Sequence, residues 1–173
     1  MKTTRLNLAA ALLLATLPLF GADKTGWAAA AEVKNPTLAQ MLTYAIQDEW
    51  AAKAEYEAIL KKWPDQRPFA NIVTTEQNHI TWLTPLFAGN GLPMPVAPKA
   101  VTLTPADWAK ALAVGVEAEQ LNIAMYDKFL KATLPAEVRT VFEELKRGSE
   151  NHLRAFQGGG GNGGGNGGGN GRS

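Results

Sequence analysis

One carboxylate and one imidazole stand three residues apart in the segment Glu76-Gln77-Asn78-His79. Residues with this spacing leave the same face of a helix, so Glu76 and His79 are expected to point the same way. The rest of that face is apolar, because the spacing is continued by Phe69, Ile72, Leu83 and Leu86. Two groups that bind metal ions within an apolar stripe indicate a buried metal site. Taken alone, the pair also fits a solvent-exposed helix surface, since short motifs often match by chance.

Three further polar side chains interrupt apolar helical stripes in the same manner, namely Glu49, Glu119 and His152. His79 and His152 are the two histidines of the whole chain. Each half of the chain has a long helical segment with a glutamate and, seven residues later, a tyrosine, followed by a helical segment with a histidine. This repeat predicts that five side chains meet in one place between helices: Glu49, Glu76, His79, Glu119 and His152.

The ligand types limit the metal. The chain has no cysteine, so a metal site must use carboxylate and imidazole groups, which suit iron, manganese or zinc rather than Cu(I). Buried ionised carboxylates are costly unless they are paired or bound to a cation. Di-iron carboxylate proteins use one Glu from each of two helices and Glu-x-x-His from each of the other two. Here Ser149 stands three residues before His152, and Glu150 lies about 100° off the stripe of a regular helix. Glu150 is therefore a sixth ligand only if a π-bulge turns it inward.

Four long helices are expected to position these residues, over about residues 35–63, 69–87, 104–131 and 136–156. Asn35 and Thr104 each precede a proline and are the expected N-caps of the first and third helices. The connection over residues 89–104 contains three prolines and is longer than a usual helix–helix turn. The fold class predicted from this pattern is all-α, a four-helix bundle with a long crossover between its second and third helices.

The two ends of the chain differ from its middle. Residues 1–31 have a basic start, an apolar run from Leu6 to Phe20 and an alanine-rich stretch, and so predict a secretory signal peptide cleaved near Ala28 to Ala31. An uncleaved anchor is disfavoured because the apolar run is shorter than the ~20 residues that span a bilayer. Residues 158–173 are nearly all Gly and Asn and are expected to be disordered. The folded domain is thus expected over residues 32–157, exported to the periplasm or the extracellular space.

Charge excludes two classes of partner. The chain has 17 basic and 16 acidic side chains; without residues 1–31 these become 14 and 15, a net charge of −1. No block of like charge stands out, so neither nucleic acid nor an anionic membrane is an expected partner. No later segment qualifies as a membrane span. The sequence leaves self-association open.

Several local stretches resemble the DUF2202 family of ferritin-like proteins. They are Gln47-Asp48-Glu49-Trp50, Pro68 to Val73, Glu76 to Ile80 and Gly148-Ser149-Glu150-Asn151-His152-Leu153-Arg154-Ala155-Phe156. The resemblance covers most of residues 38–156, and a Ser ahead of Glu-Asn-His fits the family pattern. It implies a ferritin-like four-helix fold with a di-metal centre, in which Glu76 would bridge the ions.

The same resemblance assigns roles to the remaining groups. Glu49 and His79 would serve one metal, and Glu119 and His152 the other. Tyr56 and Tyr126, with Ser149 nearby, are candidates to hydrogen-bond a ligating carboxylate. The alternative for each tyrosine is ordinary amphipathic packing.

Three functions are compatible with this sequence. The first is a redox enzyme whose two iron ions react with O₂ or peroxide, or in which Fe(II) itself is oxidised. The second is a metal-binding or buffering protein without turnover, with which the missing sixth ligand agrees. The third is a metal-free structural module. The family resemblance names no substrate and does not choose among them.

Overall fold

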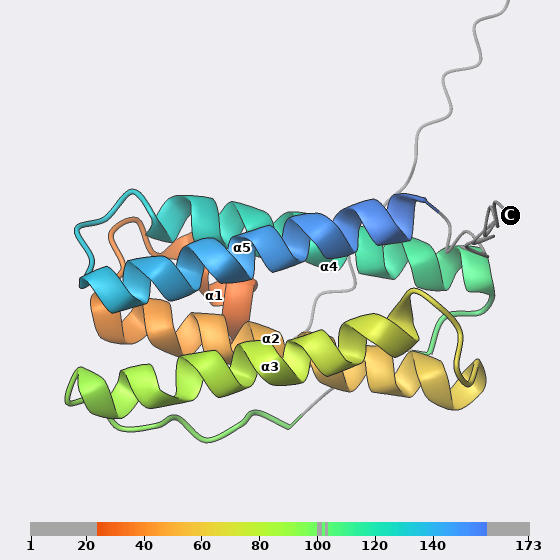
Figure 1. Ribbon diagram of the computed structural model, residues 1–173, viewed down its shortest axis with the longest axis horizontal. Coiled ribbons are helices and arrows are strands. Elements are labelled where there is room, and N and C mark those ends of the chain that lie inside the picture. The colour runs from red at the N-terminus through yellow and green to blue at the C-terminus, as the bar shows by residue number, and fades with distance from the viewer. Residues whose placement is uncertain (1–23, 100–101, 103, 159–173) are drawn as a thin grey trace, which may run out of the picture.

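The computed structural model describes residues 24–99, 102 and 104–158 (Figure 1). Its described residues form five α-helices and no strand, which confirms the all-α class. The predicted signal peptide up to residue 23 and the glycine-rich tail beyond residue 158 lie outside the described residues and stay predictions. The helices are α1 (Gly26–Glu32), α2 (Leu38–Lys62), α3 (Phe69–Gly89), α4 (Trp108–Phe129) and α5 (Ala136–Gln157).

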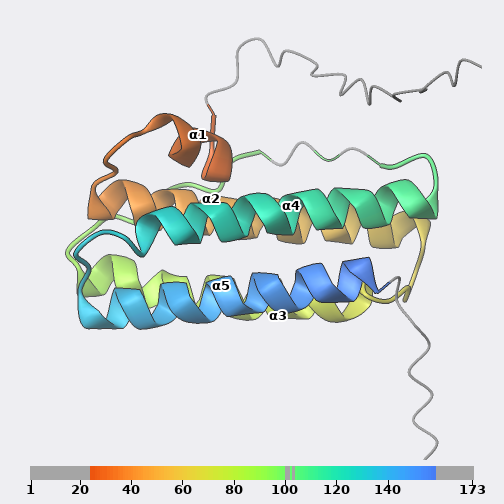
Figure 2. The same ribbon diagram turned by 90° about the horizontal axis from the view of Figure 1, so that it is seen from above.

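The four long helices α2 to α5 lie lengthwise beside one another, and the short α1 rests on the outside of α2 and α4 (Figures 1 and 2). Helix α4 runs in the same direction as α3, whereas α2 and α5 run the opposite way. This is the arrangement that the predicted crossover between the second and third helices requires. No helix in the described part of the chain combines the length and apolar character needed to cross a bilayer.

Local side chains define where the helices begin. Thr37 caps α2: its hydroxyl oxygen accepts from the Gln40 backbone N–H at 3.3 Å, and the Gln40 side chain accepts from the Thr37 N–H at 2.9 Å. Asp107 caps α4 by accepting from the Lys110 N–H at 2.8 Å. The predicted caps, Asn35 and Thr104, are therefore wrong by two and three residues. In each case the cap is the residue whose side chain reaches the N–H three positions on, a bond worth about 1 kcal/mol.

The interior is divided into two apolar clusters. One contains Leu42, Leu83 and Phe142 and lies toward the ends of the helices where α4 finishes and α5 begins. The other contains Ile59, Phe69 and Phe156. Fully burying each such side chain contributes about 1.5–3 kcal/mol. On every long helix the buried polar residues fall between the two clusters, so the polar groups form one layer in the middle of the structure: Asp48, Glu49, Glu76, His79, Glu119, Asn122, Ser149 and His152.

Helix α1 was not expected, because its residues fall within the stretch assigned to the signal peptide. Specific contacts nevertheless hold it against the long helices. The Lys128 ammonium group donates to the carbonyl oxygens of Ala30 and Val33 at 2.6 and 2.5 Å. The Trp27 backbone N–H donates to Asp48 Oδ1 at 3.0 Å, and Ala30 is 1% exposed. Residues 24–31 thus pack with the long helices in this structure, and the cleavage position near Ala28 to Ala31 stays a prediction.

Candidate metal centre

The middle layer holds two groups of side chains that can bind a metal ion. One group is Glu49, Glu76 and His79, and the other is Glu76, Glu119 and His152. In each group the ligand atoms lie within 4.8 Å of one another, and every member is buried. Each long helix supplies at least one ligand, and Glu76 belongs to both groups. The structure therefore brings together the five side chains whose convergence the helical spacing predicted. We call these five residues the Glu76 cluster.

Glu76 lies between the two histidines. Its Oε2 atom is 3.1 Å from His79 Nδ1, and its Oε1 atom is 3.1 Å from His152 Nδ1. The outer carboxylates complete the two sides, with Glu49 Oε2 3.0 Å from His79 Nδ1 and Glu119 Oε1 3.4 Å from His152 Nδ1. The imidazole rings are stacked with centroids 5.6 Å apart. One carboxylate whose two oxygens face two different imidazoles has the geometry needed to bridge two ions.

Two tyrosines hold the outer carboxylates in a reciprocal pattern. The Tyr56 hydroxyl, on α2, donates to Glu119 Oε1 on α4 at 2.8 Å. The Tyr126 hydroxyl, on α4, donates to Glu49 Oε1 on α2 at 2.7 Å. Both tyrosines also pack in the apolar clusters, so packing and hydrogen bonding occur together. Hydrogen bonds of this kind fix the orientation of carboxylates that bind metal.

The reciprocal pattern makes each tyrosine specific for one group. Tyr126→Phe should weaken metal binding at the Glu49 side by about 10–100-fold, because the carboxylate loses the donor that orients it. Tyr56→Phe should do the same at the Glu119 side. Each variant is the control for the other, and Mn²⁺ titration followed by electron paramagnetic resonance measures the two affinities. Equal weakening of both groups by either variant would contradict this assignment.

Burial and mutual charge set the protonation of the Glu76 cluster. Burial, with Glu76 nearby, raises the pKa of Glu49 to about 7. Burial alone would lower the pKa of His79, but Glu49 and Glu76 outweigh it and raise that pKa to about 10. Burial would also lower the pKa of His152, but Glu119 and Glu76 outweigh it and raise that pKa to about 9. Burial raises the pKa of Glu76, yet the close contacts with the His152 and His79 imidazoles outweigh it and leave that pKa lowered. At neutral pH the metal-free cluster therefore keeps both imidazoles protonated.

Metal binding should accordingly release protons. An ion needs an unprotonated imidazole nitrogen, and the raised pKa values of His79 and His152 mean that both nitrogens carry protons below about pH 9. Between pH 6 and pH 8, Mn²⁺ affinity should therefore rise by about tenfold per pH unit for each imidazole proton displaced. Calorimetric titration in two buffers of different ionisation enthalpy measures the protons released. An affinity independent of pH over this range would contradict the assignment of both histidines as ligands.

Some buried polar atoms in this layer have no partner. His152 Nδ1 lies close to two carboxylates but has no bond of hydrogen-bond geometry, and Asn122 Oδ1 and Ser149 Oγ also have none. An unpartnered buried polar atom costs about 1–3 kcal/mol. A cation held by His152 and its carboxylate neighbours would satisfy the imidazole nitrogen, so the donor set fits a bound ion. Ser149 is buried as predicted, but its hydroxyl contacts none of the carboxylates by a hydrogen bond.

Glu150 is not brought to the Glu76 cluster. Helix α5 is a regular α-helix throughout, so no π-bulge turns Glu150 inward. Its carboxylate is instead 3.6 Å from the Lys146 ammonium group, and its side chain is 40% exposed. The structure therefore supplies five ligands, with Ser149 on the stripe where a sixth carboxylate would stand.

Gly148 has a role that the sequence reasoning missed. A Cβ atom at this position would lie 2.6 Å from His79 Nε2 and 2.7 Å from His79 Cε1. Glycine in a helix interior costs about 1 kcal/mol relative to alanine, so its presence in the middle of α5 needs a reason. The reason is that only a residue without Cβ leaves room for the His79 ring. The signal in the sequence was a glycine directly before the Ser-Glu-Asn-His segment.

Comparison with known proteins agrees with this fold. The family "Uncharacterized protein domain (DUF2202)" matches residues 98–166. The uncharacterized protein MJ0754 of Methanocaldococcus jannaschii is 30% identical over an alignment of 126 residues, which covers 64% of this chain and 68% of that protein. A crystal structure of the hypothetical protein MJ0754 superimposes with a TM-score of 0.62 at 26% identity, covering 72% of this chain and 81% of that chain. None of these descriptions states an activity, so function has to be argued from the site.

Proposed function

This chain belongs to the DUF2202 family, and we propose that it is a ferritin-like four-helix bundle protein whose core binds two metal ions, with iron preferred. The observation that carries the proposal is the position of Glu76, whose two carboxylate oxygens each lie 3.1 Å from a different imidazole. One ion would be held by Glu49, Glu76 and His79, and the other by Glu76, Glu119 and His152. The parallel course of α3 and α4 supports the ferritin-like crossover.

The donor set favours particular ions and particular chemistry. Three carboxylates and two imidazoles are hard and borderline ligands, which suit Fe(II), Mn²⁺ or Zn²⁺. Five protein ligands for two ions leave coordination positions open to water or a small oxidant. Bound iron would supply electrons to O₂ or peroxide. The tyrosines hold the outer carboxylates in place, and the two apolar clusters exclude bulk water from both ends of the polar layer.

A second candidate function is metal binding without turnover. The outward position of Glu150 favours it, because this site has one carboxylate fewer than the di-iron pattern of two Glu and two Glu-x-x-His. A metal-free structural module is the third candidate, in which the buried acids and imidazoles would be held by hydrogen bonds alone. For all three, we propose export to the periplasm or the extracellular space, which rests on the signal peptide predicted from the sequence.

Two measurements on the full chain separate these functions. Metal analysis after purification without chelator should find iron bound to the wild-type chain. Bound iron would exclude the metal-free structural module. Consumption of O₂ or peroxide by the iron-loaded protein should then exceed that of free Fe(II) and of a Glu76→Gln variant. Iron bound without consumption would favour the metal-buffering function. No retained or bindable metal would overturn the proposal.

A further inference from the structure

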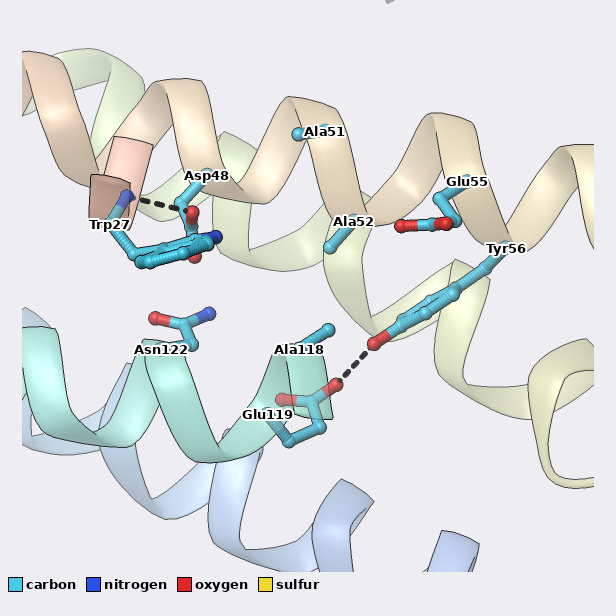
Figure 3. Close-up of a pocket in the computed structure, with 9 residues that line it drawn as sticks. All are labelled: Trp27, Asp48, Ala51, Ala52, Glu55, Tyr56, Ala118, Glu119 and Asn122. Atoms are coloured by element: carbon cyan, nitrogen blue, oxygen red, sulfur yellow. Dashed lines mark hydrogen bonds between the residues drawn. The ribbon is translucent and has the colours of Figure 1, made fainter. Parts of the chain in front are cut away.

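A pocket between α2 and α4 opens next to the Glu76 cluster. It has a volume of 60 Å³, and Glu119 and Tyr56 line it (Figure 3). One water molecule needs about 10–15 Å³ of such space, so the pocket has room for several waters. Glu119 also belongs to one of the two metal-binding groups. The pocket therefore leads from the outside of α2 and α4 to a side chain of the proposed metal centre.

The lining of this α2–α4 pocket is suited to a cation. The carboxyl groups of Asp48, Glu55 and Glu119 line it, together with the amide of Asn122, and their oxygen atoms are the ligand type that hard divalent cations prefer. Asn122 is 4% exposed, and its Oδ1 atom has no hydrogen-bond partner. Figure 3 shows the Asn122 amide directed into the pocket, across from Asp48 and beside the Trp27 ring. A buried carbonyl oxygen without a partner is explained if a hydrated cation, or its water, passes beside it.

Helix α1 covers one side of the pocket. Trp27 belongs to the lining, and its ring lies over the gap between α2 and α4 (Figure 3). Two backbone hydrogen bonds hold α1 against α2. The Gly26 N–H donates to Gln47 Oε1 at 3.2 Å, and the Trp27 N–H donates to Asp48 Oδ1 at 3.0 Å. Gly26 has a positive φ of 56°, and a Cβ atom there would lie 2.5 Å from Asp48 Oδ1. The side chain of Trp27 remains 40% exposed.

We propose that, in the chain that keeps α1, the α2–α4 pocket is the inlet through which a divalent cation reaches the metal centre by way of Glu119, with Trp27 of α1 as its cover. This inference rests on the proposed function, since it needs a metal centre to supply. The carboxylates replace part of the hydration shell as the ion moves inward, and Glu119 passes it to the group that also contains Glu76 and His152. An inlet changes the rates of entry and exit together, so it leaves the equilibrium affinity unchanged.

The test measures the rate of Co²⁺ uptake by the full chain, using a fluorescent chelator that reports free Co²⁺. Ala118→Leu places a larger side chain in the pocket and should slow uptake by about tenfold or more at unchanged final metal content. Ala113→Leu, an exposed position on the same helix, is the matched control and should load at the wild-type rate. Trp27→Ala removes the cover and should accelerate uptake.

The outcomes separate this inference from the proposed function. If Ala118→Leu and Trp27→Ala load at the wild-type rate while reaching the wild-type metal content, the inlet is overturned and the metal centre stands. If the wild type takes up no Co²⁺, the metal centre fails and the inlet fails with it. Circular dichroism of each variant shows whether the helices are intact. If Ala118→Leu is unfolded, the uptake rate of Trp27→Ala alone tests the inlet. The Trp27 side chain is partly exposed, so its removal should leave the long helices in place.

Discussion

Glu76→Gln is expected to abolish metal binding at both sites at once. Glu76 is the only member shared by the two groups, and each of its oxygens faces a different histidine. Glutamine keeps the shape but removes the negative charge and replaces one oxygen by an amide NH₂ group that cannot bind a cation. Loss of a hydrogen bond to a ligand already costs 10–100-fold in affinity, so loss of a shared ligand should exceed about 100-fold at each site. Equilibrium dialysis against Mn²⁺ with metal analysis measures this effect.

The control is Glu150→Gln, the same chemical change on a neighbouring helix. Glu150 pairs with Lys146 and is outside both groups, so its replacement should leave metal content unchanged. Thermal unfolding of the metal-free proteins shows whether each variant remains folded. If Glu76→Gln kept one ion at wild-type affinity, the bridging role would be wrong. If it kept both, the cluster would not be the metal site.

Gly148→Ala is expected to weaken the Glu49 side of the centre although it does not touch a carboxylate. The new methyl group would lie 2.6 Å from His79 Nε2, so the ring must move. On helix propensity alone, alanine should stabilise α5 by about 1 kcal/mol. Displacement of His79 should instead lower Mn²⁺ affinity at this group by about 10–100-fold, as for other losses of ligand orientation. The same Mn²⁺ titration, followed by electron paramagnetic resonance, measures the change.

Gly115→Ala provides the matched control on α4. A Cβ atom there would lie 2.7 Å from the Phe156 ring, within the second apolar cluster rather than against a ligand. Overpacking of this kind costs about 1–3 kcal/mol of stability. Gly115→Ala should therefore lower the melting temperature and spare metal affinity, whereas Gly148→Ala should lower metal affinity. Equal metal affinity in both variants and the wild type would contradict the role given to Gly148.

The helical spacing was sufficient to find the Glu76 cluster, for a physical reason. A side chain on the apolar stripe of a long helix must point toward the other helices. Glu49 and His152 lie on such stripes, so both were expected in the interior between the helices. The same spacing places Glu150 off the stripe, and in the structure its side chain lies near Lys146 and outside the cluster. The direction of α4 followed from the length of the connection after α3. These features depend on periods and lengths, which a single sequence carries.

Other features depend on contacts between distant residues, and the sequence did not reveal them. Helix α1 has seven residues and no apolar period, and it is held by Asp48 and Lys128 from elsewhere in the chain. Tyr56 and Tyr126 were expected to donate to a ligating carboxylate, but which carboxylate each one meets depends on how the two helices are placed. Asp48 is only 7% exposed, and burial raises its pKa to about 8. Its burial follows from the cover that α1 provides.

The most direct test of the central claim is to locate the ions. Crystals of the full chain grown with Fe(II) under anaerobic conditions, measured at the iron absorption edge, should show two anomalous peaks in the middle of the helices. One peak should lie among Glu49, Glu76 and His79, and the other among Glu76, Glu119 and His152. The claim would be contradicted if these five side chains were ordered and hydrogen-bonded to one another while no anomalous peak lay among them.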